Sequence, residues 1–146
     1  MTNEKTGYGM LMTSLPSKNA AAKIARKLVG EKLAACVQLY GMESFYRWQG
    51  EIVNAPETLL MIKTRLALFD TAIGRIKELH PGSLPEIVGT AFTAGLPAYF
   101  SWIDESTTVK EVKKKPEAPK GKKSGQVSAR ASTRVKTGLI QRMRRK

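Results

Sequence analysis

The chain has 146 residues, enough for one domain with a short extension, and 42% of them are hydrophobic, which suffices for a packed core. The single cysteine, Cys36, excludes an intramolecular disulfide, and no apolar run approaches the roughly 20 residues needed to cross a bilayer. The residues before Tyr8 contain no apolar segment typical of a secretory signal. We therefore expect a cytoplasmic protein.

The formal net charge of +13 is distributed unevenly along the chain. Residues 1–109 hold 11 Lys and Arg against 10 Asp and Glu, a net charge of +1. Residues 110–146 hold 14 Lys and Arg and 2 Glu, a net charge of +12. We therefore predict a nearly neutral folded domain at 1–109 and a separate basic tail at 110–146.

The first half of the domain predicts one helix and three strands. Residues 8–13 form a short apolar run, typical of a buried strand. Ser17 is placed to cap a helix whose apolar residues recur at helical spacing, and these are Ala21, Ile24, Ala25 and Leu28. Residues 34–40 and 44–48 have the composition of two further strands, and Gly41 between them predicts a hairpin turn.

The second half predicts two strands and two helices. The apolar middle of residues 57–63 suits a central strand, and Thr64 is the expected cap of a helix that ends at His80, before Pro81. Residues 86–92 predict another strand, and Pro97 a final short helix. The resulting β-α-β-β-α-β order with a terminal helix indicates an α+β, ferredoxin-like fold.

The only histidine, His80, stands beside a rigid turn that contains Pro81 and Pro85, with Glu86 six positions further on. Its imidazole is open to three interpretations: a metal ligand, a proton carrier, or a cap on the last carbonyls of the preceding helix. The chain has no Gly-rich phosphate loop, HExxH motif or paired-cysteine spacing, and one histidine leaves few ways to build a catalytic relay. We predict no enzyme activity and no catalytic residues.

Seven short strings follow one another at a characteristic spacing. They are KIARKLV at 23–29, LAACV at 33–37, FYRWQG at 45–50, LMIKT at 60–64, HP at 80–81, PEI at 85–87 and PAYFSWI at 97–103. Together they resemble the CutA divalent-cation tolerance proteins over residues 8–106.

This resemblance implies a stable homotrimer in which the long hairpin of the second and third strands reaches neighbouring subunits. Phe45, Tyr46 and Trp48 are the interface residues we expect, because a body of about 100 residues only partly covers them and exposed apolar patches mark association surfaces. The alternative is that these aromatic side chains belong to the core of a single chain.

The resemblance also implies binding of divalent metal ions, copper first, with Cys36, His80 and Glu86 as candidate ligands. Thiolate and imidazole favour copper or zinc over magnesium, but one Cys and one His make an incomplete ligand set unless subunits pool ligands. Cys36 is alternatively a small buried hydrophobe in a strand. No cofactor is required on this interpretation.

Three positions depart from the family pattern. Gly82 and Ser83 stand where CutA proteins usually have Tyr and Glu, and Leu96 stands where Asn is common. The loss of an oxygen ligand and an aromatic wall predicts weaker metal binding than in a typical member.

A lesser alternative is a nucleotide sensor, because the fold and trimer also resemble PII-type signalling proteins. Phosphate binding would then need Arg47, Lys63 and Arg65 to converge.

The basic tail lacks the hydrophobicity to fold and carries no aromatic residue among its charges, so we expect disorder and sequence-independent contact with a polyanion such as nucleic acid. A solubilising extension, an anionic membrane surface and a nuclear signal are the alternatives. The candidate contact residues are Lys113, Lys114, Lys115, Lys122, Lys123, Arg142, Arg144 and Arg145.

Overall fold

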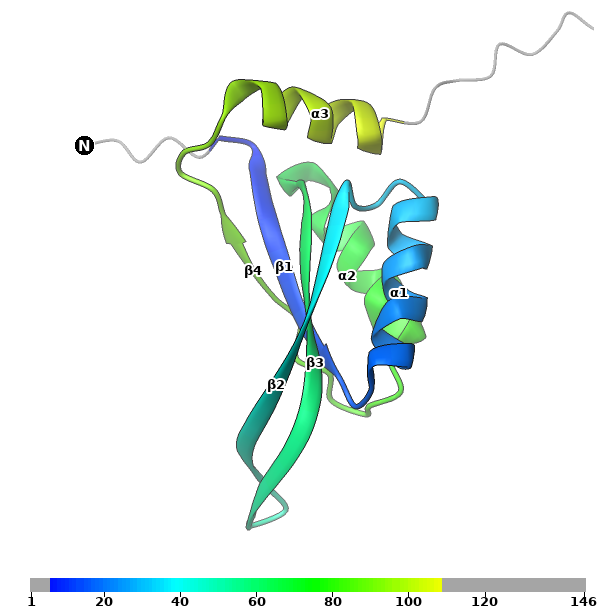
Figure 1. The fold of residues 1–146 in the computed structure, drawn as a ribbon, viewed down its shortest axis with the longest axis vertical. Helices are drawn as coiled ribbons and strands as arrows, with labels where there is room; N and C mark the ends of the chain where they lie inside the picture. Colours follow the sequence, from blue (N-terminus) through cyan, green and yellow to red (C-terminus); the bar gives the residue numbers. More distant parts are fainter. Residues whose placement is uncertain (1–5, 109–146) are drawn as a thin grey trace, which may run out of the picture. The chain divides into compact units, whose positions relative to one another are not determined.

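The computed structural model describes residues 6–108, which form a four-stranded antiparallel sheet and three α-helices (Figure 1). The elements are β1 (Tyr8–Leu15), α1 (Lys18–Gly30), β2 (Cys36–Trp48), β3 (Glu51–Arg65), the 3-10 turn η1 (Leu66–Leu68), α2 (Phe69–Leu79), β4 (Val88–Ala91) and α3 (Pro97–Thr107). The strand order is β2-β3-β1-β4. This arrangement confirms the predicted α+β, ferredoxin-like fold with a C-terminal helix.

The basic tail and all eight of its candidate contact residues lie outside the described residues. Within residues 6–108, no helix is both long and apolar enough to span a bilayer.

The core lies between the sheet and the two helices α1 and α2, which pack on the same face (Figure 1). Successive strand residues point to opposite faces, so Leu11 and Leu15 of β1 face the helices while Met12 faces away. The fully buried side chains that meet them are Leu60 and Ile62 from β3, Ala21, Ile24 and Leu28 from α1, and Ala72 and Ile76 from α2. Ser17 caps α1 as predicted, since its hydroxyl accepts a hydrogen bond from the Ala20 N–H at 3.2 Å.

The prediction of two strands separated by a turn at Gly41 is wrong. Residues 36–48 form the single strand β2, which pairs with β3 without interruption, and Gly41 lies opposite Thr58 within that ladder. The turn is at Gln49 and Gly50, which both have positive φ angles, 51° and 88°. Such two-residue turns match the twist of an antiparallel hairpin, so they join its strands more readily than a single glycine inside a strand.

The β2–β3 hairpin projects beyond the rest of the sheet, as Figure 1 shows. β1 ends at Leu15, opposite Thr58, so residues 51–57 of β3 pair with β2 alone. Pro56 lies in this singly paired part, where a residue without an N–H donor is tolerated.

The prediction of Thr64 as a helix cap is also wrong. Thr64 belongs to β3, opposite Gly9, and α2 begins only at Phe69 after the turn η1. Gly9 permits this path, because a Cβ added there would lie 2.5 Å from the Thr90 carbonyl oxygen and 2.7 Å from the Phe69 ring. A long-range contact therefore delays the start of the helix.

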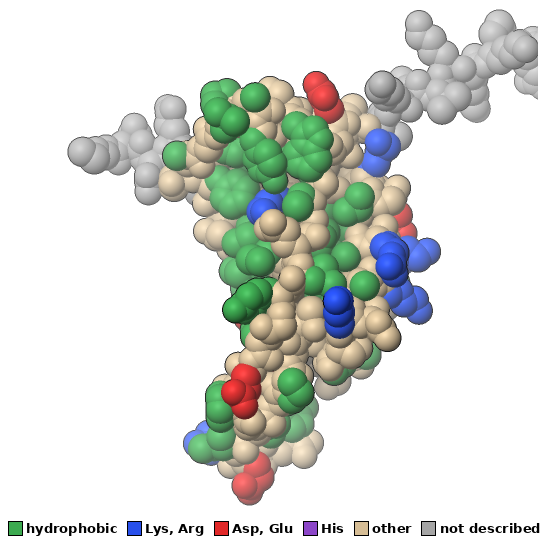
Figure 2. All heavy atoms as spheres, in the orientation of Figure 1, with side chains coloured by type: hydrophobic (Ala, Val, Ile, Leu, Met, Phe, Trp, Pro, Cys, Tyr) green, Lys and Arg blue, Asp and Glu red, His purple; other side chains and the backbone are tan. Residues whose placement is uncertain are grey.

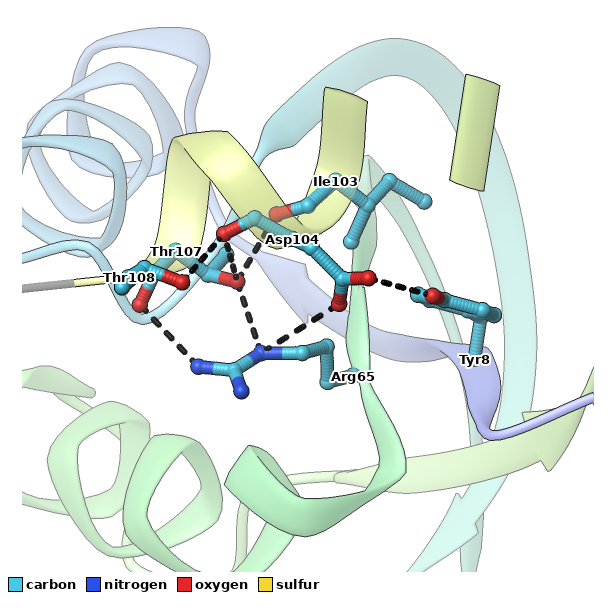
Figure 3. A network of polar contacts seen from close by, with 6 residues as sticks. All are labelled: Tyr8, Arg65, Ile103, Asp104, Thr107 and Thr108. Atoms are coloured by element: carbon cyan, nitrogen blue, oxygen red, sulfur yellow. Dashed lines mark hydrogen bonds and ion pairs between the residues drawn. The ribbon is translucent and has the colours of Figure 1, made fainter. Parts of the chain in front are cut away.

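A polar network fixes α3 against the ends of β1 and β3 (Figure 3). The Tyr8 hydroxyl donates to Asp104 Oδ2 at 2.6 Å, and Arg65 donates from Nε to Thr107 Oγ1 at 2.9 Å and from Nη2 to the Thr107 carbonyl at 3.1 Å. The Tyr8 ring also stacks on Phe100, with centroids 4.4 Å apart. These contacts join residues about 40 to 100 positions apart and so fix the last helix to the sheet.

We predict that Tyr8 ionises at unusually high pH. The hydrogen bond to Asp104, followed by desolvation and the carboxylate charge, raises the pKa of Tyr8 above its ordinary value of 10.0, although Arg65 opposes the shift. A raised folded pKa means that this bond stabilises the fold fully below pH 10 and is lost as pH rises through the folded value. Ultraviolet titration of Tyr8→Phe should therefore lack one high-pH ionisation, and its stability should fall less steeply above pH 10.

The control for this titration is Tyr40→Phe, which removes a phenol that is 65% exposed. This substitution should leave the high-pH ionisation of Tyr8 in place. An unchanged high-pH curve for Tyr8→Phe would contradict the assignment.

Candidate functional site

A groove of about 730 Å³ lies between the projecting β2–β3 hairpin and the loop that follows α2. Three segments form it: the end of β1, the hairpin, and residues 80–86. The lining residues are Ser14, Pro16, Ser44, Phe45, Tyr46, Trp48, Glu57, His80, Pro81, Gly82, Ser83, Leu84, Pro85 and Glu86. The groove thus has an aromatic wall on the hairpin side and two carboxylates, and no lysine or arginine lines it.

His80 ties the groove loop to the sheet through both ring nitrogens. Its Nε2 lies 2.7 Å from the Ser14 carbonyl oxygen, and its Nδ1 accepts the Gly82 N–H at 2.9 Å. Because Nδ1 is the acceptor, the proton belongs on Nε2, which donates to Ser14. The imidazole therefore bridges the end of β1 and the turn after α2.

Gly82 allows this turn to close tightly on the ring. A Cβ at this position would lie 3.1 Å from both Cε1 and Nδ1 of His80, closer than side chains normally approach. Glycine at position 82 thus accommodates the hydrogen bond from its own N–H to the imidazole.

Ser14 also orients the first carboxylate of the groove. Its hydroxyl donates to Glu57 Oε1 at 3.1 Å, while its carbonyl accepts from His80. Serine, histidine and glutamate therefore meet here, but the imidazole faces the serine carbonyl and not its hydroxyl. The geometry lacks the serine-to-histidine hydrogen bond that a nucleophilic relay needs.

Cys36 does not line this groove. It starts β2 opposite Lys63, whereas Ser14, which holds the imidazole, lies opposite Leu59, four residues earlier on β3. This offset amounts to about 13 Å at roughly 3.3 Å per residue. Cys36 is half-buried and lies beside Tyr99 of α3. Burial of the Tyr99 phenol raises the pKa of Tyr99, and the charge and hydrogen bonding of Cys36 add to this shift.

The structure thus brings His80 and Glu86 to one groove and leaves Cys36 apart from them. Glu57 is the ligand candidate that sequence reasoning missed, because it sits inside a predicted strand and meets Ser14 across 43 positions of sequence. Within residues 6–108, no group of three or more His, Cys, Asp and Glu side chains is arranged to hold a metal ion. The imidazole is also engaged at both nitrogens. One chain's described residues therefore do not form a complete metal site.

The aromatic residues Phe45, Tyr46 and Trp48 line the same groove and are 70%, 44% and 43% exposed. They do not form a core within this chain. Ile52 on β3 pairs with Arg47 and is 72% exposed, so it shares a face of the hairpin with Phe45, whereas Tyr46 and Trp48 alternate to the other face. The hairpin thus exposes apolar side chains on both of its faces.

The three cations considered for phosphate binding do not converge. Arg47 lies at the hairpin tip, opposite Ile52 of β3. Ile52 precedes Lys63 by eleven residues on the same strand, so Arg47 and Lys63 are separated by about 36 Å along the sheet at roughly 3.3 Å per residue. Arg47 donates to the Gly50 carbonyl, Lys63 bonds Gln38, and Arg65 is held by α3. The structure thus offers no phosphate cluster from these residues.

Comparison with known proteins supports one family. The family model described as "CutA1 divalent ion tolerance protein" matches residues 9–106. The chain belongs to this family. A curated relative, the divalent-cation tolerance protein CutA of Thermus thermophilus, is 42% identical over 99 residues, which cover 67% of this chain and 96% of that protein.

Other relatives extend the comparison. Chloroplastic protein CutA of Arabidopsis thaliana is 35% identical over 99 residues, 67% of this chain and 54% of its own length, so the chain spans about half of that protein. The crystal structure of CutA from Xylella fastidiosa superposes with a TM-score of 0.69 at 38% identity, covering 70% of this chain and all of that one. The structure of the periplasmic CutA from Archaeoglobus fulgidus gives a TM-score of 0.68 at 33% identity, covering 69% and 99%.

We predict that the single imidazole exists as the Nε2–H tautomer in the folded protein. Nitrogen NMR of selectively labelled histidine should show Nδ1 unprotonated and an Nε2 proton protected from exchange, because that proton is bonded to Ser14. Gly82→Ala should perturb these signals, since the added methyl group crowds the ring, whereas Gly74→Ala, where a Cβ meets nothing within 4 Å, should not. A rapidly exchanging mixture of tautomers would contradict the bridge.

Proposed function

We propose that the protein binds divalent metal ions, copper first, at the groove between the hairpin and residues 80–86, and serves metal tolerance or homeostasis. The observation that carries this proposal is that His80, Glu57 and Glu86 line one groove without a cation among its lining residues. Family membership supports it, since the relatives are named for divalent-cation tolerance.

The expected affinity is weak. Carboxylate oxygens are available from Glu57 and Glu86, but the imidazole can coordinate through Nδ1 only if it gives up the Gly82 N–H. A tetrahedral site wants about four ligands. We therefore propose that neighbouring subunits complete the ligand set, and that Cys36 lies outside it.

We propose a homotrimer as the working assembly. Its support is the set of exposed apolar side chains on the two faces of the hairpin, Phe45 and Ile52 on one and Tyr46 and Trp48 on the other, together with the sheet face that α1 and α2 leave uncovered. Assembly through these surfaces would place groove residues of one chain near those of another.

We propose a binding role and not a catalytic one, because the serine hydroxyl in the groove donates to a carboxylate and is not activated by the imidazole. Cytoplasmic location stays a prediction.

Calorimetric titration with Cu(II) and Zn(II) tests the metal site. Glu57→Gln and Glu86→Gln should each weaken binding, because each removes a carboxylate charge at little change in size. His80→Gln retains an amide donor for the Ser14 carbonyl while removing the imidazole, so it separates ligation from loop integrity. Cys36→Ser is the matched control and should bind as the unmodified chain does. Loss of binding in Cys36→Ser, with the groove variants unaffected, would move the site away from the groove.

Sedimentation equilibrium tests the assembly. We expect a mass three times the 16.1 kDa of one chain. Trp48→Asp should lower that mass, because it places a charge on the apolar hairpin surface. Lys77→Asp, on the exposed side of α2, should leave it unchanged. A monomer mass for the unmodified chain would refute the trimer.

A further inference from the structure

Helix α1 presents a surface of a single charge sign. We define the α1 cationic face as Lys18, Lys23, Arg26 and Lys27, all of them exposed. The helix contains no acidic residue, and its apolar residues Ala21, Ile24 and Leu28 are buried against the sheet. Figure 2 shows Lys and Arg side chains gathered along the edge of the molecule where α1 lies in Figure 1.

These cations have no ion-pair partner among residues 6–108. The three salt bridges of that part of the chain join Arg65 to Asp104 and Arg75 to both Glu31 and Glu78. Glu31, the acidic residue that follows the helix, is therefore already bound by Arg75, at 2.7 Å. The bond from Arg75 lowers the pKa of Glu31, and the charge of Lys27 adds a smaller contribution in the same direction, although none of the three salt bridges of residues 6–108 joins Lys27 to that carboxylate.

Helix stability does not account for the pattern. Lys23 has like charges three and four positions on, at Arg26 and Lys27, and such pairs destabilise a helix. Lys18 in the first turn opposes the helix dipole, and no acidic residue there offsets it. Only Lys27, in the last turn, has a favourable position.

We propose that the α1 cationic face binds the phosphate backbone of double-stranded nucleic acid, independently of sequence and of the metal groove. Lys18 and Lys27 are nine residues apart, about 13 Å along the axis at 1.5 Å per residue, and at 3.6 residues per turn they lie on opposite edges of the exposed side, with Lys23 and Arg26 between them. The four cations therefore spread over the whole exposed side of the helix, over an axial length of roughly four phosphates of one strand, which lie about 3.4 Å apart along the duplex axis. No aromatic residue lies on this face, so it contacts phosphates and does not stack on bases.

Two further features favour an external phosphate polymer over other partners. An anionic membrane is disfavoured because the apolar face of α1 is already buried, and among its large apolar residues only Val29 is exposed, at 43%. The tail sequence carries a net charge of +12, the same sign as the α1 cationic face, so charge complementarity favours an anionic partner for this face.

The α1 cationic face is separate from the surfaces that we propose for trimer assembly. α1 packs on the sheet face opposite the uncovered one, and the hairpin surface lies at another end of the domain. Nucleic-acid contact and metal binding are therefore separable, and the test is made in the presence of EDTA.

The test measures binding of the full chain to a random-sequence DNA duplex by fluorescence anisotropy between low and moderate salt. In Lys23→Gln/Arg26→Gln, the slope of log K against log salt should become less steep by about 2, since each lost phosphate contact changes it by about 0.9. The charge-matched control is Arg47→Gln/Lys77→Gln, at the hairpin tip and on α2, and it should keep the original slope. The thermal unfolding midpoint of the α1 variant should be equal or higher, because like-charge repulsion is relieved.

Equal salt slopes for the two variants would overturn the proposal and assign any binding to net charge or to the tail. Absence of duplex binding by the unmodified chain would also overturn it. A third contrary result concerns vesicles that contain phosphatidylserine. If Lys23→Gln/Arg26→Gln loses the binding to these vesicles that the unmodified chain shows, while its duplex binding is unchanged, a lipid surface is the partner of α1.

Discussion

The register of β3 is the constraint on which the rest of the structure depends. This strand pairs with β2 from Glu51 to Lys63 but with β1 only from Thr58 onward. Its second half therefore carries the core, with Leu60 and Ile62 fully buried, whereas its first half projects as a hairpin without a helix layer. The groove exists because the end of β1 leaves space between this hairpin and the loop after α2.

The histidine bridge controls the other side of that groove. His80 ends α2, and its ring reaches back to the carbonyl of Ser14, near the end of β1. The same ring accepts the N–H of Gly82 and so holds the turn that carries the following residues to Glu86. The side chain with the strongest claim to metal binding thus also has a structural role. Coordination and loop geometry compete for the same nitrogen, which explains why we propose a weak site.

Charge is segregated over the surface of the domain. The groove contributes the carboxylates of Glu57 and Glu86, whereas α1 contributes only cations. A nearly neutral domain therefore carries two oppositely charged surfaces on different elements. An acidic groove suits metal ions and a cationic helix suits phosphates, so the two proposed activities do not compete for one surface.

Local signals in the sequence determined much of the fold. The cap at Ser17, the stop at His80 before Pro81 and the start of α3 at Pro97 each depend on neighbours within a few residues, and the structure confirms all three. The order of elements and the family followed from the same short strings. Only the tertiary structure decided that Gly41 continues a strand and that Thr64 does not start a helix. It also decided that Glu57 meets Ser14 and lines the same groove as His80. Cys36, by contrast, lies about 13 Å away from this groove along the sheet. The physical reason is that caps and turns arise from local backbone geometry, whereas strand register and the meeting of side chains depend on pairing between residues about 40 or more positions apart.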